Sequence, residues 1–229
     1  MQAETLNPSC RMSDVEARLA AHHGRPIWHS HGSPLDVLIG TVLSQHTSDT
    51  NTARSFASLR ATFPEWRDVL TAPTTHVADA IRCGGLANIK APRIQNILRS
   101  IAEVSCDITL DWLPSVTLHG ARSWLLSLPG VGPKTAGCVL LFSLGLPAMP
   151  VDTHVYRVSR RLNLIPDEVS ADDAHGLLDG LIGPDRNAIY SIHLNLIRHG
   201  RMVCKARAPA CPTCILSSIC PSATRYSSV

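Results

Sequence analysis

The hydrophobic positions along this chain recur at helical rather than strand spacing. After Ser33, a typical helix N-cap, the apolar residues Leu35, Leu38, Ile39 and Val42 follow at intervals of three and four. Alternation with period two is scarce, so we predict an all-α fold. Further helices are expected over residues 49–62, 74–82, 90–104, 117–127, 134–145, 153–162, 171–182 and 186–199.

Local signals set the expected ends of several helices. Ser13 with Glu16 three residues later forms a capping-box pattern, and Gly24 is placed to end that first helix. Gly200 is expected to end the last long helix. The first dozen and the last eight residues are predicted to be loose tails.

Composition narrows the class of protein. A chain of 229 residues with 45% hydrophobic content can form one large domain or two small ones. The longest apolar run, residues 137–149, is shorter than the roughly 20 residues of a membrane helix, so we expect no membrane partner. No secretory signal is evident, and four scattered cysteines suit a reducing compartment, which together predict a cytoplasmic, nucleoid-associated protein. These are Cys10, Cys83, Cys106 and Cys138.

Four further cysteines near the C-terminus form the most informative cluster. Cys204, Cys211, Cys214 and Cys220 have the spacing Cys-x6-Cys-x2-Cys-x5-Cys. Four thiolates in so short a segment can complete the coordination of a metal centre. The spacing alone leaves structural zinc and an iron–sulfur cluster both open.

A glycine-rich turn between two predicted helices carries the second motif. In Leu128-Pro-Gly-Val-Gly-Pro-Lys134, Gly130 and Gly132 bracket a tight hairpin, where glycine tolerates positive φ. The proline that follows suits the first turn of a helix. Free backbone N–H groups at such a hairpin can bind a phosphate without reading sequence. A plain helix–helix turn is the alternative.

Cationic side chains add to this interpretation. The net charge is only +3 and the pI is near 8.5, which is compatible with DNA binding without demonstrating it. Either cluster of cations alone suits a solvated face, but beside a phosphate-binding hairpin a DNA-facing surface is favoured. The clusters are Arg157, Arg160 and Arg161 on one helix face, and Arg198, Arg201, Lys205 and Arg207 near the cysteine segment.

Together the hairpin, Lys134, Asp152 and the four-cysteine segment resemble the endonuclease III family of helix–hairpin–helix DNA glycosylases, over about residues 13–220. The resemblance implies a [4Fe–4S] cluster at the four cysteines. It also implies two lobes. A six-helix domain with the hairpin would span 27–146, and a discontinuous cluster domain would combine 1–26 with 147–229.

The resemblance assigns the chemistry to two residues. Lys134 would be the nucleophile; its place in the first turn of a helix disfavours an ammonium. Asp152 would stabilise positive charge on the sugar and help deprotonate the amine, and it also suits the N-cap of the next helix. An ordinary surface lysine and a purely structural cap are the alternatives.

Contacts with the duplex are expected from three loops and the cysteine segment. The loop 43–49 would insert a polar side chain into the gap left by the extruded nucleotide. His46 stands at the position where the family often has glutamine, with Gln45 beside it, so both are candidates. Leu86 matches a second inserted residue, although an ordinary core leucine is as plausible. The remaining predicted contacts are Gly130, Val131, Gly132, Lys205 and Arg207.

The predicted function is a monomeric, bifunctional DNA glycosylase and abasic-site lyase of base excision repair. Its partner would be double-stranded DNA with damaged bases or abasic sites, and its substrates oxidised pyrimidines of the thymine glycol type. A Schiff base on Lys134 would lead to β-elimination. Two alternatives stay open, a glycosylase for mismatched or other damaged bases and a non-catalytic DNA-binding iron–sulfur protein.

Overall fold

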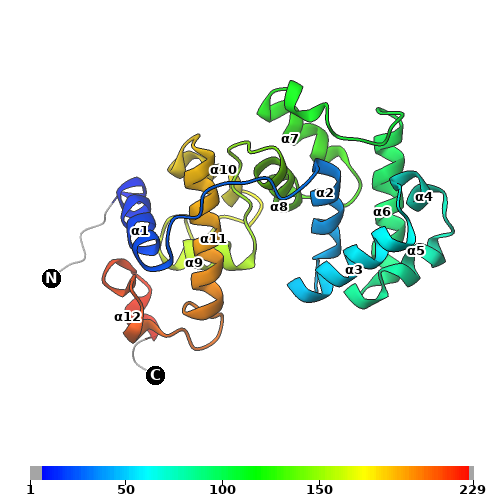
Figure 1. The fold of residues 1–229 in the computed structure, drawn as a ribbon. Helices are drawn as coiled ribbons and strands as arrows, with labels where there is room; N and C mark the ends of the chain where they lie inside the picture. Colours follow the sequence, from blue (N-terminus) through cyan, green and yellow to red (C-terminus); the bar gives the residue numbers. More distant parts are fainter. Residues whose placement is uncertain (1–6, 227–229) are drawn as a thin grey trace. The chain divides into compact units, whose positions relative to one another are not determined.

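The computed structural model describes residues 7–226, and every regular element in that range is helical (Figure 1). The all-α prediction is confirmed. The chain divides into two compact units. Ser30–Leu144 form the central unit, and the segments up to His29 and from Gly145 onward form the flanking unit.

The central unit is a run of helices and single turns joined by short loops. Its elements are α2 (Pro34–Leu43), α3 (Asp49–Thr62), α4 (Trp66–Thr71), α5 (Thr74–Ala80), a 3-10 turn (Arg82–Gly84), α6 (Ala87–Ala102), a 3-10 turn (Leu113–Ser115), α7 (Leu118–Ser127), α8 (Pro133–Cys138) and a π-helical turn (Val139–Ser143).

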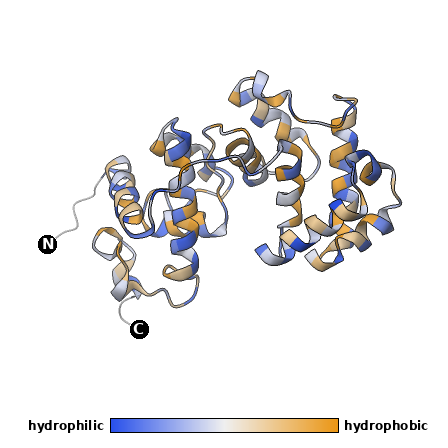
Figure 2. Cartoon of the chain, viewed as in Figure 1, coloured by the Kyte–Doolittle hydropathy of each residue, from blue (hydrophilic) through white to orange (hydrophobic). Residues whose placement is uncertain are grey.

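Helix α2 lies at the centre of this unit because it is apolar on nearly every side (Figure 2). The Ser33 hydroxyl caps its start by accepting the Asp36 N–H at 3.1 Å. Leu38, Ile39 and Val42 are fully buried. The helix packs against α3, α6, α8 and the π-helical turn, so the loops that leave its two ends start from a rigid element.

The flanking unit is organised around its longest helix. Its elements are α1 (Pro8–His23), α9 (Thr153–Arg161), α10 (Ala174–Ile182), α11 (Arg186–Met202), two 3-10 turns (Cys211–Thr213 and Ser217–Ile219) and α12 (Ala223–Tyr226). Helix α11 contacts α1, α9 and α10.

Gly200 does not end α11 as expected, because the helix continues to Met202. A Cβ at Gly200 would lie 3.0 Å from the Cβ of His154 on α9. The glycine therefore serves close packing between two helices rather than termination.

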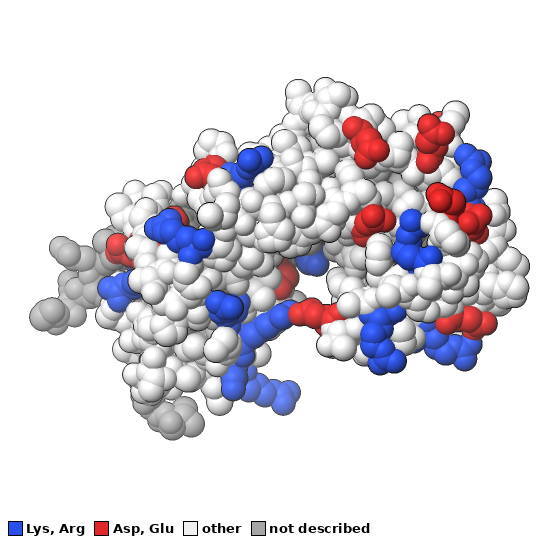
Figure 3. Space-filling model, viewed as in Figure 1, with Lys and Arg blue, Asp and Glu red and all other residues white. Residues whose placement is uncertain are grey.

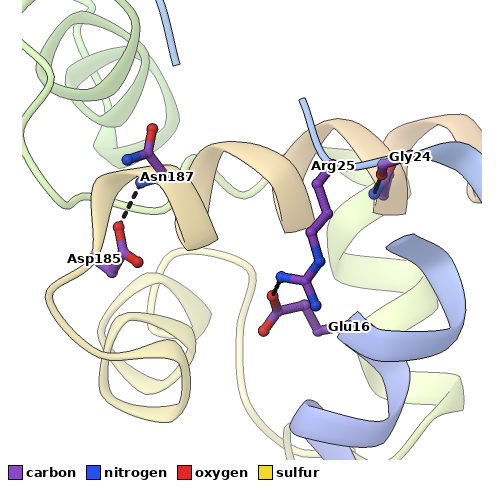
Figure 4. A network of polar contacts seen from close by, with 6 residues as sticks. Glu16, Gly24, Arg25, Asp185 and Asn187 are labelled. Atoms are coloured by element: carbon purple, nitrogen blue, oxygen red, sulfur yellow. Dashed lines mark hydrogen bonds and ion pairs between the residues drawn. The ribbon is translucent and has the colours of Figure 1, made fainter. Parts of the chain in front are cut away.

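The first helix begins earlier than predicted. It starts at Pro8 with Asn7 as its N-cap, so the Ser13–Glu16 capping box is wrong. Glu16 instead pairs with Arg25 at 2.8 Å (Figure 4). The same figure shows the N-cap of α11, where Asp185 accepts the Asn187 N–H. Gly24 does cap the helix, with φ of 86°.

Three further departures concern element boundaries. Helix α4 was not predicted, and its start is fixed by a capping box between Glu65 and Asp68. The expected helix 134–145 is α-helical only to Cys138 and then widens into the π-helical turn. Helices α1 and α12 occupy parts of the expected tails, whose residues 1–6 and 227–229 lie outside the described range.

Among the described helices, none combines the length and apolar character needed to span a membrane.

Lys90 of α6 is a buried cation that joins two loops of the central unit. Its side chain is 1% exposed, and burial lowers the pKa of its ammonium. The Nζ donates to the carbonyl oxygens of Leu43 at 2.7 Å and Gly84 at 2.9 Å. Leu43 ends α2, and Gly84 closes the 3-10 turn before Leu86, so one side chain fixes the start of both loops.

Replacing Lys90 with methionine should lower the free energy of unfolding by about 1–3 kcal/mol, because the two buried carbonyls lose their donor while the stem volume is kept. Thermal denaturation followed by circular dichroism measures this. The exposed Lys205→Met is the matched control and should change stability by less than about 0.5 kcal/mol. Equal midpoints for both variants would contradict the assigned role of Lys90.

Candidate functional site

The predicted hairpin forms a tight turn between α7 and α8. The Val131 N–H donates to the Leu128 carbonyl at 3.1 Å, and Gly130 has φ of 75°, a combination typical of a type II turn. Val131 is buried, so only its backbone is available to a ligand. Gly132 has an ordinary φ of −97°, which makes the expectation of a second positive φ wrong. A Cβ at Gly132 would meet no protein atom within 4 Å, so a ligand can approach the backbone there.

Lys134 lies in the first turn of α8, directly after the hairpin. Its side chain is half-buried, and its ammonium donates no hydrogen bond to the residues described, 7–226. It lines an open pocket of the central unit together with Asp36, Thr41, Cys138 and Phe142. The amine therefore faces a space that a small group can enter.

The wall of this pocket combines aromatic and acidic side chains. His31 stacks on Phe142 with ring centroids 4.8 Å apart and planes inclined by 20°. Asp36 and Asp49 bring carboxylates to the same pocket. The π-helical turn carries Phe142, and such turns are frequent at functional sites.

Asp152 caps α9 as the sequence indicates. Its Oδ1 accepts the backbone N–H groups of His154 and Val155, both at 2.8 Å. Its Oδ2 accepts no hydrogen bond from residues 7–226. One oxygen of this half-buried carboxylate is thus fixed by the helix start, and the other can act on a ligand.

The segment before Asp152 is held by side chains of α10 and α11. The Nδ1 atoms of His175 and His193 contact the carbonyl oxygens of Met149 at 2.8 Å and Pro150 at 2.9 Å. The Met149 N–H donates to Asp179 at 2.6 Å. Both histidines are buried, so they serve the backbone that leads to Asp152 rather than a metal.

The loop between α2 and α3 separates its two candidate side chains. Gln45 is half-buried, and its Oε1 accepts a hydrogen bond from Arg93 at 2.7 Å. His46 is exposed and has φ of 54°, in the left-handed region. The two neighbours therefore have different surroundings.

Leu86 is an exposed residue, not a core leucine. Its side chain is 48% exposed, beside Ile89 at 54%. Its φ of 51° places it in the left-handed region at the N-cap of α6. The structure thus exposes this apolar side chain, and its insertion into the base stack stays a prediction.

The four predicted cysteine ligands come together. Cys204, Cys211, Cys214 and Cys220 line one small pocket of the flanking unit. The Sγ of Cys214 accepts the Leu216 N–H at 3.4 Å and lies 3.6 Å from Nε2 of His199. Burial lowers the pKa of this histidine to about 4, with a further contribution from His23 and His22.

The donor set suits a metal–sulfur centre. Burial raises the pKa of Cys211, Cys214 and Cys220, and the neighbouring Cys204 raises all three further. Four thiolates would repel one another in this pocket, so a bound cation is needed to keep them ionised. Within residues 7–226, no three His, Cys, Asp or Glu side chains are already arranged as ligands of a metal ion.

Two arginines of α9 donate hydrogen bonds to the backbone of the cysteine segment. Arg161 donates to the Sγ of Cys204 at 3.3 Å and to the carbonyl oxygens of Lys205 and Ala206 at 2.7 and 3.0 Å. Arg157 donates to the Cys204 carbonyl at 3.0 Å, and Arg160 pairs with Asp167. Arg157 and Arg161 are therefore engaged with the cysteine segment, and the expectation that the three arginines face DNA stays a prediction.

The second cationic cluster is exposed. Its members surround the C-terminal end of α11 and the segment that follows, and side chains of this kind gather there on the face that Figure 3 shows. They are Arg198, Arg201, Lys205 and Arg207.

The structure thus groups the predicted residues into two sets. The central unit contains Gln45, His46, Leu86, the hairpin and Lys134, and the flanking unit contains Asp152 and the four cysteines. That Lys134 and Asp152 act together stays a prediction. Sequence reasoning missed Lys90 and Arg93, although Lys90 falls on the apolar stripe of α6 with Ile94, Ile97 and Leu98 and could have been noticed there.

Comparison with known proteins places this arrangement in a family. Residues 39–182 match the family described as HhH-GPD superfamily base excision DNA repair protein. The chain is 39% identical over 170 residues to a putative DNA glycosylase of Arabidopsis thaliana, a match covering 74% of this chain and 57% of that protein. It is 34% identical over 196 residues to endonuclease III of Thermotoga maritima, covering 84% of each.

Solved structures agree. A trapped covalent intermediate of endonuclease III with DNA superposes with a TM-score of 0.79 at 29% identity, covering 95% of this chain and 97% of that one. A non-covalent endonuclease III–DNA complex gives the same TM-score. A thermostable thymine-DNA glycosylase, at 20% identity, shares the fold. The chain belongs to the HhH-GPD superfamily of base excision DNA repair proteins and is an endonuclease III-like DNA glycosylase.

Proposed function

We propose that this protein is a bifunctional DNA glycosylase and abasic-site lyase that removes oxidised pyrimidines. The observation that carries the proposal is the Lys134 amine, which is half-buried, bonded to no described residue and open to a pocket directly behind the phosphate-binding hairpin. The trapping of a similar protein as a covalent intermediate with DNA supports a mechanism in which the enzyme bonds covalently to its substrate.

In this mechanism the hairpin holds the backbone while the damaged nucleotide turns out of the stack. The N-glycosidic bond breaks, and the departing base takes a proton. The Lys134 nitrogen bonds to C1′ and, as the sugar ring opens, forms a Schiff base. Loss of a C2′ proton then expels the 3′ phosphate and cuts the strand.

Asp152 would stabilise the positive charge that develops on the sugar ring. Two helix N–H groups hold Oδ1 in place, and Oδ2 is available to accept the proton of the attacking amine. The anchored segment Met149–Val151 restricts where this carboxylate can lie.

We further propose that Cys204, Cys211, Cys214 and Cys220 hold a [4Fe–4S] cluster, which supplies no step of base removal. When bound, it would close the segment that displays Lys205 and Arg207 to phosphates. Arg157 and Arg161 hold the same segment from α9.

The substrate class is inferred from the pocket beside Lys134. The stacked pair His31 and Phe142 offers an aromatic wall, and polar side chains such as Thr41 and Asp36 offer partners for ring carbonyl and N–H groups. A pyrimidine ring that has lost planarity leaves the base stack at reduced cost, which favours its extrusion.

Replacing Lys134 with glutamine should abolish the borohydride-trapped adduct with an abasic duplex while binding survives, because the amine proposed to form the Schiff base is removed. Denaturing gels measure the adduct. The chain contains three lysines, and Lys90 is buried, so Lys205→Gln is the matched control and should still be trapped at saturating DNA. An undiminished adduct in Lys134→Gln would refute the assignment.

Asp152→Asn should slow base removal by roughly 10²–10⁴-fold, because asparagine keeps the helix cap and loses the charge. Single-turnover kinetics on a thymine glycol duplex measure this, with the thermal midpoint as the check that the cap is intact. A rate close to that of the wild type would rule out a catalytic role for the carboxylate.

Cys211→Ser should lose the visible absorbance of the cluster and lower the thermal midpoint, because one metal–sulfur bond is removed. The exposed Cys106→Ser is the control and should keep both properties. Iron, sulfide and zinc are assayed in anaerobically purified protein. Zinc without iron would overturn the assignment of the cofactor.

A further inference from the structure

One side chain of α6 spans two of the loops that the proposed function brings to DNA. Arg93 donates from Nη1 to the Oε1 of Gln45 at 2.7 Å. Its stem lies across the hairpin: a Cβ at Gly130 would meet the Nε of Arg93 at 2.7 Å and its Cδ at 2.8 Å. Any larger residue at position 130 would collide with the Arg93 side chain. Arg93 therefore contacts both the hairpin and the loop 44–48.

Gln45 and His46 differ in their freedom because of this contact. Gln45 is half-buried and engaged with a guanidinium, so moving it into a duplex would break a charge-assisted hydrogen bond. His46 is exposed, and its φ of 54° lies in the left-handed region. The loop is therefore built to hold the first side chain and to release the second.

The start of the loop is fixed independently. The buried Lys90, one turn before Arg93 on α6, holds the Leu43 carbonyl at the end of α2. The loop is thus anchored to α6 at Leu43 and again at Gln45, and His46 is the residue that follows the second anchor.

We propose that Arg93 is a positioning residue that ties the loop 44–48 to the hairpin, so that His46 rather than Gln45 fills the gap left by the extruded nucleotide. This inference rests on the proposed function. Arg93 acts through Gln45 and needs no contact with DNA, and its effect on binding is expressed entirely by His46.

A double-mutant cycle in the full-length protein tests this. Affinity is measured by fluorescence anisotropy for a duplex with a tetrahydrofuran abasic analogue and for the same duplex undamaged. Arg93→Met keeps the stem over Gly130 and removes the hydrogen bond. It should reduce the preference for the abasic duplex about tenfold, within the range of coupling between contacting residues.

Gln45→Ala should give a loss similar to that of Arg93→Met, and the two should not add. In the His46→Ala background, neither should cost more than about twofold further. Arg93→Lys, which can still reach Gln45, should recover much of the preference. Arg99→Met is the control, since this exposed side chain of α6 bonds within residues 7–226 to its helix neighbour Asn96 alone, and it should match the wild type.

Three results would overturn the inference. Arg93→Met could leave the preference for the abasic duplex unchanged. Its effect could persist at full size in the His46→Ala background, which would mean that Arg93 binds a phosphate directly. The loss in Gln45→Ala could also persist there, which would make Gln45 the inserted residue. If Arg93→Met does not fold, the Gln45 and His46 variants decide by themselves.

The wild type separates this inference from the proposed function. A wild-type protein without preference for the abasic duplex would contradict the proposed function and the role of Arg93 together. A wild type that prefers the abasic duplex, with Arg93→Met behaving identically, contradicts the role of Arg93 alone.

Discussion

The ammonium of Lys90 is the interaction on which the central unit's functional loops depend. It is a buried cation with no carboxylate partner in the described structure, and it is neutralised only by the carbonyl dipoles of Leu43 and Gly84. Burying a charge is costly unless hydrogen bonds compensate it, so both carbonyls must stay in place for the unit to fold. The loop with His46 follows Leu43 and the turn with Leu86 follows Gly84, so the Lys90 hydrogen bonds fix where each begins.

In the flanking unit, arginine side chains hold an irregular segment in place as Lys90 does in the central unit. Arg157 and Arg161 donate to carbonyl oxygens of the cysteine segment, which has few regular elements of its own. Arg161 also donates to the Sγ of Cys204, so the same cation holds both the backbone and one cysteine side chain of this segment. These arginines were expected at a DNA surface. In the structure both are half-buried and bonded to this segment, while the cations at the end of α11 and just after it are exposed.

The sequence predicted much of this structure and failed where long-range contacts decide. Periodic apolar residues and caps such as Ser33 and Asp152 located most helices, because those signals are local. The early start of α1 was missed although its signals, an Asn7 N-cap followed by Pro8, are local. The π-helical turn at Val139 was missed because its apolar residues are equally compatible with a continuous α-helix. The hairpin, Lys134 and the four cysteines were found from motif spacing. Arg93 could not be found, because its contacts with Gln45 and Gly130 bridge residues 37 or more positions away and leave no local pattern.

Gln45 and His46 are neighbours in the sequence but have different surroundings in the structure. Both residues were candidates from the sequence, because no sequence pattern distinguishes two adjacent polar side chains in one loop. The structure distinguishes them by burial, by one hydrogen bond and by the sign of φ. Geometry therefore converts an ambiguous alignment into a choice between two side chains.

The central claim is that Lys134 attacks the sugar of a damaged nucleotide. The most direct measurement is borohydride trapping of the wild-type protein on a duplex with one thymine glycol, followed by peptide mapping of the adduct by mass spectrometry. With three lysines in the chain, the assignment is nearly unambiguous. The account predicts a deoxyribose remnant on the peptide that contains Lys134. An adduct on Lys205 or on the N-terminal amine would contradict the account. So would the absence of an adduct on both this duplex and an abasic one.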